Sequence, residues 1–195
     1  MDYAAILAHL FCRADPVSHA PNPNRSILVD AITGGKKAMQ ARRADPIRLI
    51  ALRMKQDEVR NVVQRPGVNG AFRVTIQYHD ARHPNQVATL IRGHSGPCTL
   101  HVVYDKPGKD VHFTYAIEAA RFTTLHTVLR RIRFDGMDDQ PDVPFFGVDL
   151  WLVERGSGSF YHDVVLSPDS ARGLYRELIL ALREHLKEAL RPIEA

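Results

Sequence analysis

The order of periodic patterns from residue 71 to the C-terminus constrains the fold of this chain more than any other feature. Before residue 66, apolar residues recur with the spacing of helices; from Ala71 they alternate with polar residues, as in half-buried strands. Four strand-like runs lead into one helical run, and two more strands and a final helix follow. This order predicts an α+β fold, with one mainly antiparallel sheet of about six strands, a long C-terminal helix and an N-terminal helical region.

The clearest local prediction is a hairpin around Pro107-Gly108. Apolar residues alternate on both sides of a turn that runs from Asp105 to Asp110. One register places every apolar side chain of the two strands on the same face. That register pairs Tyr104 with Val111, Val102 with Phe113, and Leu100 with Tyr115.

Two helices have clear start signals. Asp45 is a capping residue and Pro46 suits the first helical position, and this helix must end by Pro66-Gly67. Its apolar stripe comprises Ile47, Ile50, Met54, Val59, Val62 and Val63. Ser167-Pro168-Asp169 predicts the start of the C-terminal helix, with a buried face of Leu174, Leu178, Leu182 and Leu186. We therefore divide the chain into a helical region at 1–66, basic in its second half, and a sheet domain at 67–195.

The two faces of the predicted sheet differ in character. One is strongly apolar and needs helices over it. The other mixes polar and apolar side chains: Thr75, Gln77, Thr99, His101, His112 and Thr114 with Val103, Trp151, Val153 and Val165. Such a face is covered either by the N-terminal helices or by a partner. A second copy of the chain could cover it and also protect a strand edge, so a homodimer is expected.

Charge is concentrated in one stretch of the chain. The formal net charge is +4 and the sequence pI is about 9.2, yet the nine basic residues of 34–65 face only Asp45, Asp57 and Glu58. This asymmetry predicts an anionic partner, with nucleic acid as the first hypothesis. The residues predicted to contact it are Lys36, Lys37, Arg42, Arg43, Arg48, Arg53, Arg60, Arg130 and Arg131.

No catalytic motif stands out. Gly93-His94-Ser95-Gly96 lacks the spacing of a nucleophile elbow, and Thr33-Gly34-Gly35-Lys36-Lys37 lacks the first glycine and the hydroxyl residue of a phosphate loop. The alternation of the strands places His79, His101 and His112 on the same face of the predicted sheet. These histidines are the first residues to consider if the fold assembles an enzyme site. No ligand spacing supports a metal, so neither a metal nor a cofactor is predicted.

Cysteine use and hydropathy point to the cytoplasm. Cys12 and Cys98 lie far apart and form neither metal nor redox spacing, which favours a reduced compartment. No apolar run reaches the roughly 18–20 residues that a membrane helix needs, so no membrane association is expected.

The element order resembles two groups of binding domains. Strand-rich units closed by a helix resemble Whirly-like and PUR-like binders of single-stranded nucleic acid, and this resemblance implies self-association. Two strands and a final helix after a first helix also resemble type III secretion chaperones, which are dimers that hold extended client segments. The sequence thus predicts a non-enzymatic binding protein with an anionic partner; the alternatives are a protein-binding adaptor or chaperone-like dimer, and an enzyme with a histidine site.

Overall fold

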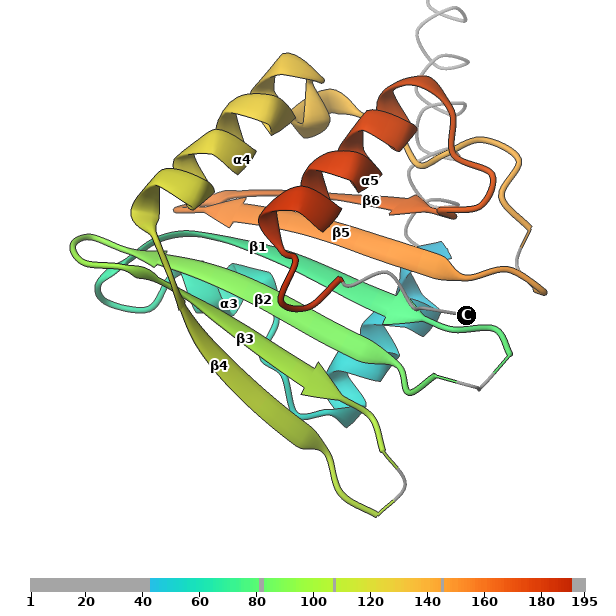
Figure 1. Cartoon of the computed structure of the whole chain (residues 1–195), viewed down its shortest axis with the longest axis horizontal. Helices are drawn as coiled ribbons and strands as arrows, with labels where there is room; N and C mark the ends of the chain where they lie inside the picture. The colour runs from blue at the N-terminus through green and yellow to red at the C-terminus, as the bar shows by residue number, and fades with distance from the viewer. Residues whose placement is uncertain (1–42, 81–82, 107, 145, 191–195) are drawn as a thin grey trace, which may run out of the picture. The chain divides into compact units, whose positions relative to one another are not determined.

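A computed structural model describes residues 43–80, 83–106, 108–144 and 146–190 of the chain (Figure 1). Residues 43–53 are helical and are followed by the short helix α3. The other elements are one six-stranded antiparallel sheet and the helices that follow its fourth and sixth strands. Their bounds are α3 Val59–Val63, β1 Val68–Gln77, β2 Gln86–Gly93, β3 Cys98–Tyr104, β4 Val111–Ile117, α4 Ala119–Arg131, η1 Phe134–Gly136, β5 Leu150–Ser157, β6 Phe160–Leu166 and α5 Gly173–His185.

The predicted fold class and element order are confirmed. Strands β1 to β4 form a meander, and β5 returns beside β1 after α4, which gives the sheet order β4-β3-β2-β1-β5-β6. The register predicted for the hairpin of β3 and β4 is also confirmed, with Tyr104 opposite Val111 and Leu100 opposite Tyr115.

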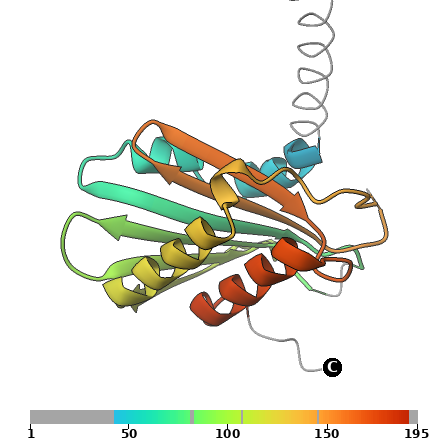
Figure 2. The ribbon, with the colours of Figure 1, turned by 90° about the horizontal axis from the view of Figure 1, so that it is seen from above.

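Helices α4 and α5 pack on one face of the sheet, and Figure 2 shows them on the opposite side from α3 and residues 43–53. Two residues assigned to the mixed face belong here instead, since Trp151 lies opposite Ile76 and Val153 opposite Val74. The prediction for these two was wrong because pairing with β1 decides which side chains of β5 face the helices. The paired residues lie 73 or more positions apart, and no local pattern in the sequence reveals this pairing. Val103 and Val165 do lie on the second face.

The second face is covered by the chain's own residues 44–63. Ile47, Ile50 and Met54 pack with Val87 and Leu152, all of them buried. Farther along the sheet, the buried valines of α3 pack against Ala71 of β1. Of the two arrangements that the sequence leaves open for this face, the described residues show the covering helices.

The helix predicted from Asp45 to Pro66 is divided in two. Its apolar stripe is buried as predicted, but the helical residues end at 53, and Lys55 has a left-handed φ of 55°. A linker at 55–58 then leads into α3, so the two helices cover different parts of the sheet.

The C-terminal helix begins later than Ser167-Pro168-Asp169. Ser167 N–H donates to the Gln140 Oε1 atom at 3.1 Å, and Ala171 is buried. These contacts hold the chain in a turn before α5, which starts at Gly173. Leu174 is therefore exposed rather than part of the buried face, whereas Leu178 and Leu182 are buried as predicted.

The two edges of the sheet differ. Beside β6, Val165 N–H donates to Asp139 Oδ1 at 2.7 Å, and Gln140 N–H donates to the Val165 carbonyl at 2.9 Å, so residues 139–140 cover this edge at Val165. Strand β4 ends the sheet on the other side and is mostly exposed. Phe113 on β4 is 45% exposed and stacks beside Tyr115.

Candidate functional site

A row of polar side chains crosses the second face of the sheet. In this row each residue lies directly opposite the next one on the neighbouring strand. From β4 to β6 the row is Thr114, His101, Thr89, Arg73, Glu154 and Asp163. The adjacent row, with Val87 and Leu152, lies under residues 44–54, and the row on the other side, with Ala71 and Gly156, lies under α3. The polar row therefore runs between the two helices.

The space between these helices is a groove of about 850 Å³, which we call the main groove. A smaller cavity of about 220 Å³, the side pocket, lies next to it. Both are lined by Arg73 and by Lys55, Gln56 and Asp57 of the linker. The rest of the main groove is formed by Asp45, Arg48, Leu49, Ala51, Leu52, Glu58, Arg60, Asn61, Glu154 and Tyr161, and the rest of the side pocket by Val62, Arg65, Thr89, Ile91 and His101.

Arg73 is the central residue of both cavities. It is only 3% exposed, and two hydrogen bonds fix its guanidinium: Nε donates to Thr89 Oγ1 at 2.9 Å, and Nη1 donates to the Asp57 carbonyl at 2.7 Å. Burial lowers its pKa, against the opposing effect of Glu154, but an arginine remains charged. Among the described residues, no carboxylate lies within ion-pair distance of Arg73, and none accepts a hydrogen bond from Nη2.

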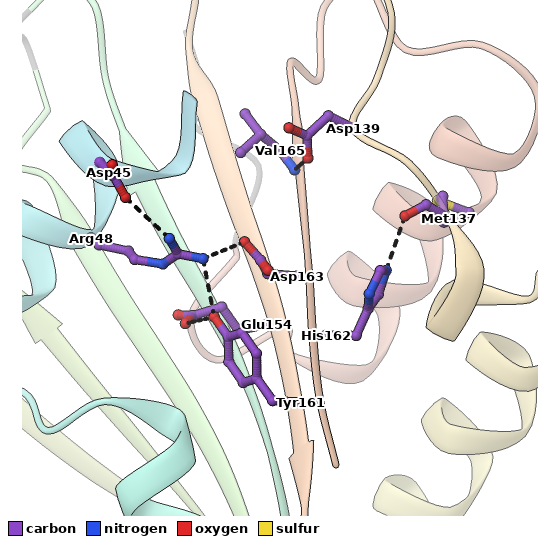
Figure 3. Close-up of polar contacts among 9 residues, drawn as sticks. All are labelled: Asp45, Arg48, Met137, Asp139, Glu154, Tyr161, His162, Asp163 and Val165. Carbon is purple, nitrogen blue, oxygen red and sulfur yellow. Dashed lines mark hydrogen bonds and ion pairs between the residues drawn. The ribbon is translucent and has the colours of Figure 1, made fainter. Parts of the chain in front are cut away.

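Glu154, opposite Arg73 on β5, is 5% exposed. Its Oε1 atom accepts a hydrogen bond from the Tyr161 hydroxyl at 2.7 Å (Figure 3). Burial raises the pKa of Glu154, while Arg73, the Tyr161 hydroxyl and Arg48 oppose this shift. Burial and the nearby Glu154 also raise the pKa of Tyr161, so its hydroxyl remains a donor.

Arg48 reaches from the helical residues 43–53 toward the same cluster. Its Nη2 atom lies 2.6 Å from Asp163 Oδ2 and 3.4 Å from the Tyr161 hydroxyl, and Nη1 lies 3.2 Å from Asp45 Oδ1 (Figure 3). Burial alone would lower the pKa of Arg48, but Asp163, Tyr161 and Glu154 raise it above its usual value. The contacts with Asp163 and Tyr161 attach the helix to β6 at the edge of the main groove.

The residues predicted to bind nucleic acid do not form one surface. Lys36, Lys37 and Arg42 lie outside the described residues. Arg48 and Arg60 line the main groove, and the Arg60 guanidinium lies 4.3 Å from the centroid of the Tyr161 ring. The remaining positions are Arg43 (beside the Gln140 carbonyl), Arg53 (paired with Asp105), and Arg130 and Arg131 on α4 (Arg131 paired with Glu177).

Because of this distribution, only some of the predicted basic residues can contact the same ligand. Helix α4 lies on the opposite face of the sheet from the groove, so Arg130 and Arg131 cannot contact a ligand held there. Arg48 and Arg53 each pair with a carboxylate of the chain. Arg73 and Glu154 are the residues that sequence reasoning missed. The available signal was a charged side chain in the middle of each of two otherwise largely apolar strands.

The three histidines of the enzyme hypothesis lie in two places. His101 lines the side pocket, with Nδ1 3.1 Å from Thr114 Oγ1, and burial and Arg65 lower its pKa. His112 is exposed on β4, diagonally beside it. His79 follows the far end of β1 and pairs with Asp149 at 2.8 Å. In the part of the chain that the structure describes, no group of three or more His, Cys, Asp or Glu side chains could hold a metal ion.

No protein-family model matches the chain, and no curated protein shows significant similarity to it. Within the described ranges, every helix is too short or too polar to cross a membrane. The groove and its residues are therefore the basis for assigning a function.

Proposed function

We propose that this is a binding protein whose partner places an anionic group in the side pocket, against Arg73. The lining of this pocket supports an anion, because Lys55, Arg65 and Arg73 face a single carboxylate, Asp57. Asp57 in turn pairs with Arg65. Thr89 and His101 add polar atoms to the wall of the pocket.

The observation that carries the proposal is the buried charge of Arg73. Removing a guanidinium from water costs several kcal/mol unless an opposite charge compensates. Arg73 is 3% exposed, and its two hydrogen bonds are to neutral oxygen atoms of Thr89 and Asp57. The Arg73 Nη2 atom has no hydrogen-bond partner among the described residues, and it is not fully enclosed by the protein. It can therefore be reached from the cavities that Arg73 lines. Glu154 and Asp57 oppose the lowering of the Arg73 pKa from beyond ion-pair distance, so a ligand oxygen at Nη2 would add a direct ionic contact. Ionisable groups held this way in a cleft are typical of functional sites.

Nucleic acid is the partner we propose first, because each nucleotide carries a phosphate. Lys55 and Arg60 are exposed at the mouth of the groove and could contact phosphates on either side of the one held by Arg73. Phosphate contacts of this kind do not depend on sequence and weaken as salt concentration rises.

The test is the affinity of the chain for a short fluorescent single-stranded oligonucleotide, measured by anisotropy at several salt concentrations. Arg73→Met removes the charge and keeps an unbranched apolar side chain, and should weaken binding at least about tenfold. Lys55→Gln changes an exposed side chain and should reduce the salt dependence by about one counterion. Arg130→Gln, on the opposite face, is the matched control and should leave the affinity unchanged. Binding that is insensitive to both salt and Arg73→Met would contradict the proposal.

Self-association is a second proposal, and the open edge of β4 favours it. Residues 139–140 cover the β6 edge at Val165, whereas no described residue pairs with the outer edge of β4. This strand contains neither proline nor lysine, the residues that commonly protect an edge. Antiparallel pairing of two β4 strands would join two copies through one symmetric contact.

A further inference from the structure

We propose that the main groove holds a nucleobase, preferably guanine, next to the phosphate bound at Arg73. The site would then accept a nucleotide, either free or within a single strand. This inference rests on the proposed function, because it requires the phosphate to occupy the side pocket.

The arrangement of the two cavities supports a ligand with two different ends. They meet at Arg73 and at the linker, so a ligand can extend from one into the other. Basic side chains dominate the side pocket. The main groove instead has equal numbers of basic and acidic lining residues: Arg48, Lys55, Arg60 and Arg73 against Asp45, Asp57, Glu58 and Glu154. A neutral group is better suited to such a groove than a second phosphate, and about 850 Å³ is ample for a base and its sugar.

Glu154 determines which base would fit. Tyr161 donates to Oε1, no described residue donates to Oε2, and Oε2 is not among the fully enclosed atoms without a partner. Oε2 therefore keeps a small exposure, and Glu154 lines the main groove, where we place the base. A carboxylate only accepts hydrogen bonds. Guanine offers two adjacent donors, N1–H and the 2-amino group. Adenine and cytosine offer one amino group beside a ring nitrogen whose lone pair a carboxylate repels, and uracil and thymine offer one N–H between two carbonyl oxygens.

Other residues of the groove provide contacts for a planar ring. Arg60 and Tyr161 lie one over the other at 4.3 Å, and both line the groove. Bases stack on aromatic rings and on arginine planes. Leu49 and Leu52 are 63% and 65% exposed and add an apolar wall from the helical residues 43–53.

The experiment compares four probes by calorimetric titration: guanosine, inosine and uridine 5′-monophosphates, and inorganic phosphate. Guanosine monophosphate should bind at least about tenfold more tightly than uridine monophosphate. Inosine monophosphate lacks the 2-amino group, so its affinity for the unmodified protein should lie between those of guanosine and uridine monophosphates. This comparison needs no protein variant. Arg73→Met should weaken all four. Equal affinity for guanosine and uridine monophosphates, with Arg73→Met still weakening both, would overturn the base site and leave the proposed function standing.

Variants of two groove carboxylates test the role assigned to Glu154. Glu154→Gln should bring the guanosine-to-uridine affinity ratio close to one and leave phosphate binding in place. Glu58→Gln removes one negative charge from the exposed wall of the same groove and should leave the ratio unchanged. An unchanged ratio in Glu154→Gln would refute the assignment. If none of the four probes binds and a short oligonucleotide also fails to bind, both the inference and the proposed function are wrong.

The last comparison separates the two sources of the nucleotide. A thymine oligonucleotide with one central guanine is measured against the same oligonucleotide with thymine throughout. A preference of at least about tenfold for the guanine-containing strand places the site on a nucleic-acid chain. A preference confined to the free nucleotides identifies a nucleotide-binding protein with the same two-part site.

Discussion

The covering of the second sheet face by residues 43–53 can be tested with two neighbouring apolar residues. Ile47 is fully buried against the sheet, whereas Leu49, on the same helix, is 63% exposed. Replacing Ile47 by Ala removes three carbon atoms, worth about 2.4 kcal/mol at about 0.8 kcal/mol each. The cavity left behind raises the expected loss in unfolding free energy to about 3–4 kcal/mol. Leu49→Ala removes the same number of atoms, but mostly from water, and should cost about 0.5–1 kcal/mol.

Urea unfolding of the two variants and the unmodified protein gives these free energies. Trp151, the single tryptophan, is buried on the opposite face of the sheet, so its fluorescence reports unfolding without direct disturbance from either substitution. The predicted difference of about 2–3 kcal/mol corresponds to a separation of about 1–2 M urea between the two midpoints, at an unchanged slope. If Ile47→Ala and Leu49→Ala unfold within about 0.5 kcal/mol of each other, the helix is not packed on the sheet as described.

Three further predictions concern packing, pH and assembly. Gly156→Ala places a Cβ 3.0 Å from methyl groups of Val59 and Val63, so it should lower the unfolding free energy by about 1–3 kcal/mol. Adding Val63→Ala removes one of these contacts and should recover part of the loss. Burial raises the pKa of Asp139 to about 6, above the unfolded value, so the folded state binds the proton more tightly and loses stability as pH rises from about 4 to about 6. Asp139→Asn keeps an acceptor for Val165 N–H. Above about pH 6 this variant should unfold at a higher temperature than the unmodified protein, and near pH 4 the two unfolding temperatures should be equal. A constant difference in unfolding temperature across this range would contradict the raised pKa of Asp139. For the β4 edge, light scattering should show a dimer for the unmodified chain and a monomer for Phe113→Lys, and a monomer in both cases would exclude pairing through β4.

Local patterns were sufficient for the order of elements and for the β3–β4 register, because alternation and turn position specify both within one short segment. They were insufficient wherever a distant contact decides the outcome. Trp151 and Val153 were assigned to the wrong face because the pairing of β5 with β1 sets their orientation. The interruption of the helix at Lys55 could not be read from the sequence either. Met54 and Val59 fit one continuous apolar stripe, although Met54 lies in the turn after the first helical segment and Val59 begins α3.

The candidate site illustrates the same limit. Arg73 and Glu154 become neighbours only because β5 pairs with β1, the first strand of the meander, rather than with β4, its last strand. The density of basic residues in 34–65 drew attention to a region that does contribute Arg48, Lys55 and Arg60 to the groove. It also suggested Arg53, which pairs with Asp105. Charge density in a sequence does not reveal which arginines the folded chain neutralises with its own carboxylates.

The central claim is that Arg73 and the groove around it receive the anionic group of the partner. The most direct test is a map of NMR chemical-shift changes as a short single-stranded oligonucleotide is added to the isotopically labelled chain. The account predicts that the largest changes fall on the Arg73 side-chain Nε–H, on the amides of 55–57, and on Thr89 and Glu154. Changes centred on α4, or none at oligonucleotide concentrations that saturate binding, would contradict it.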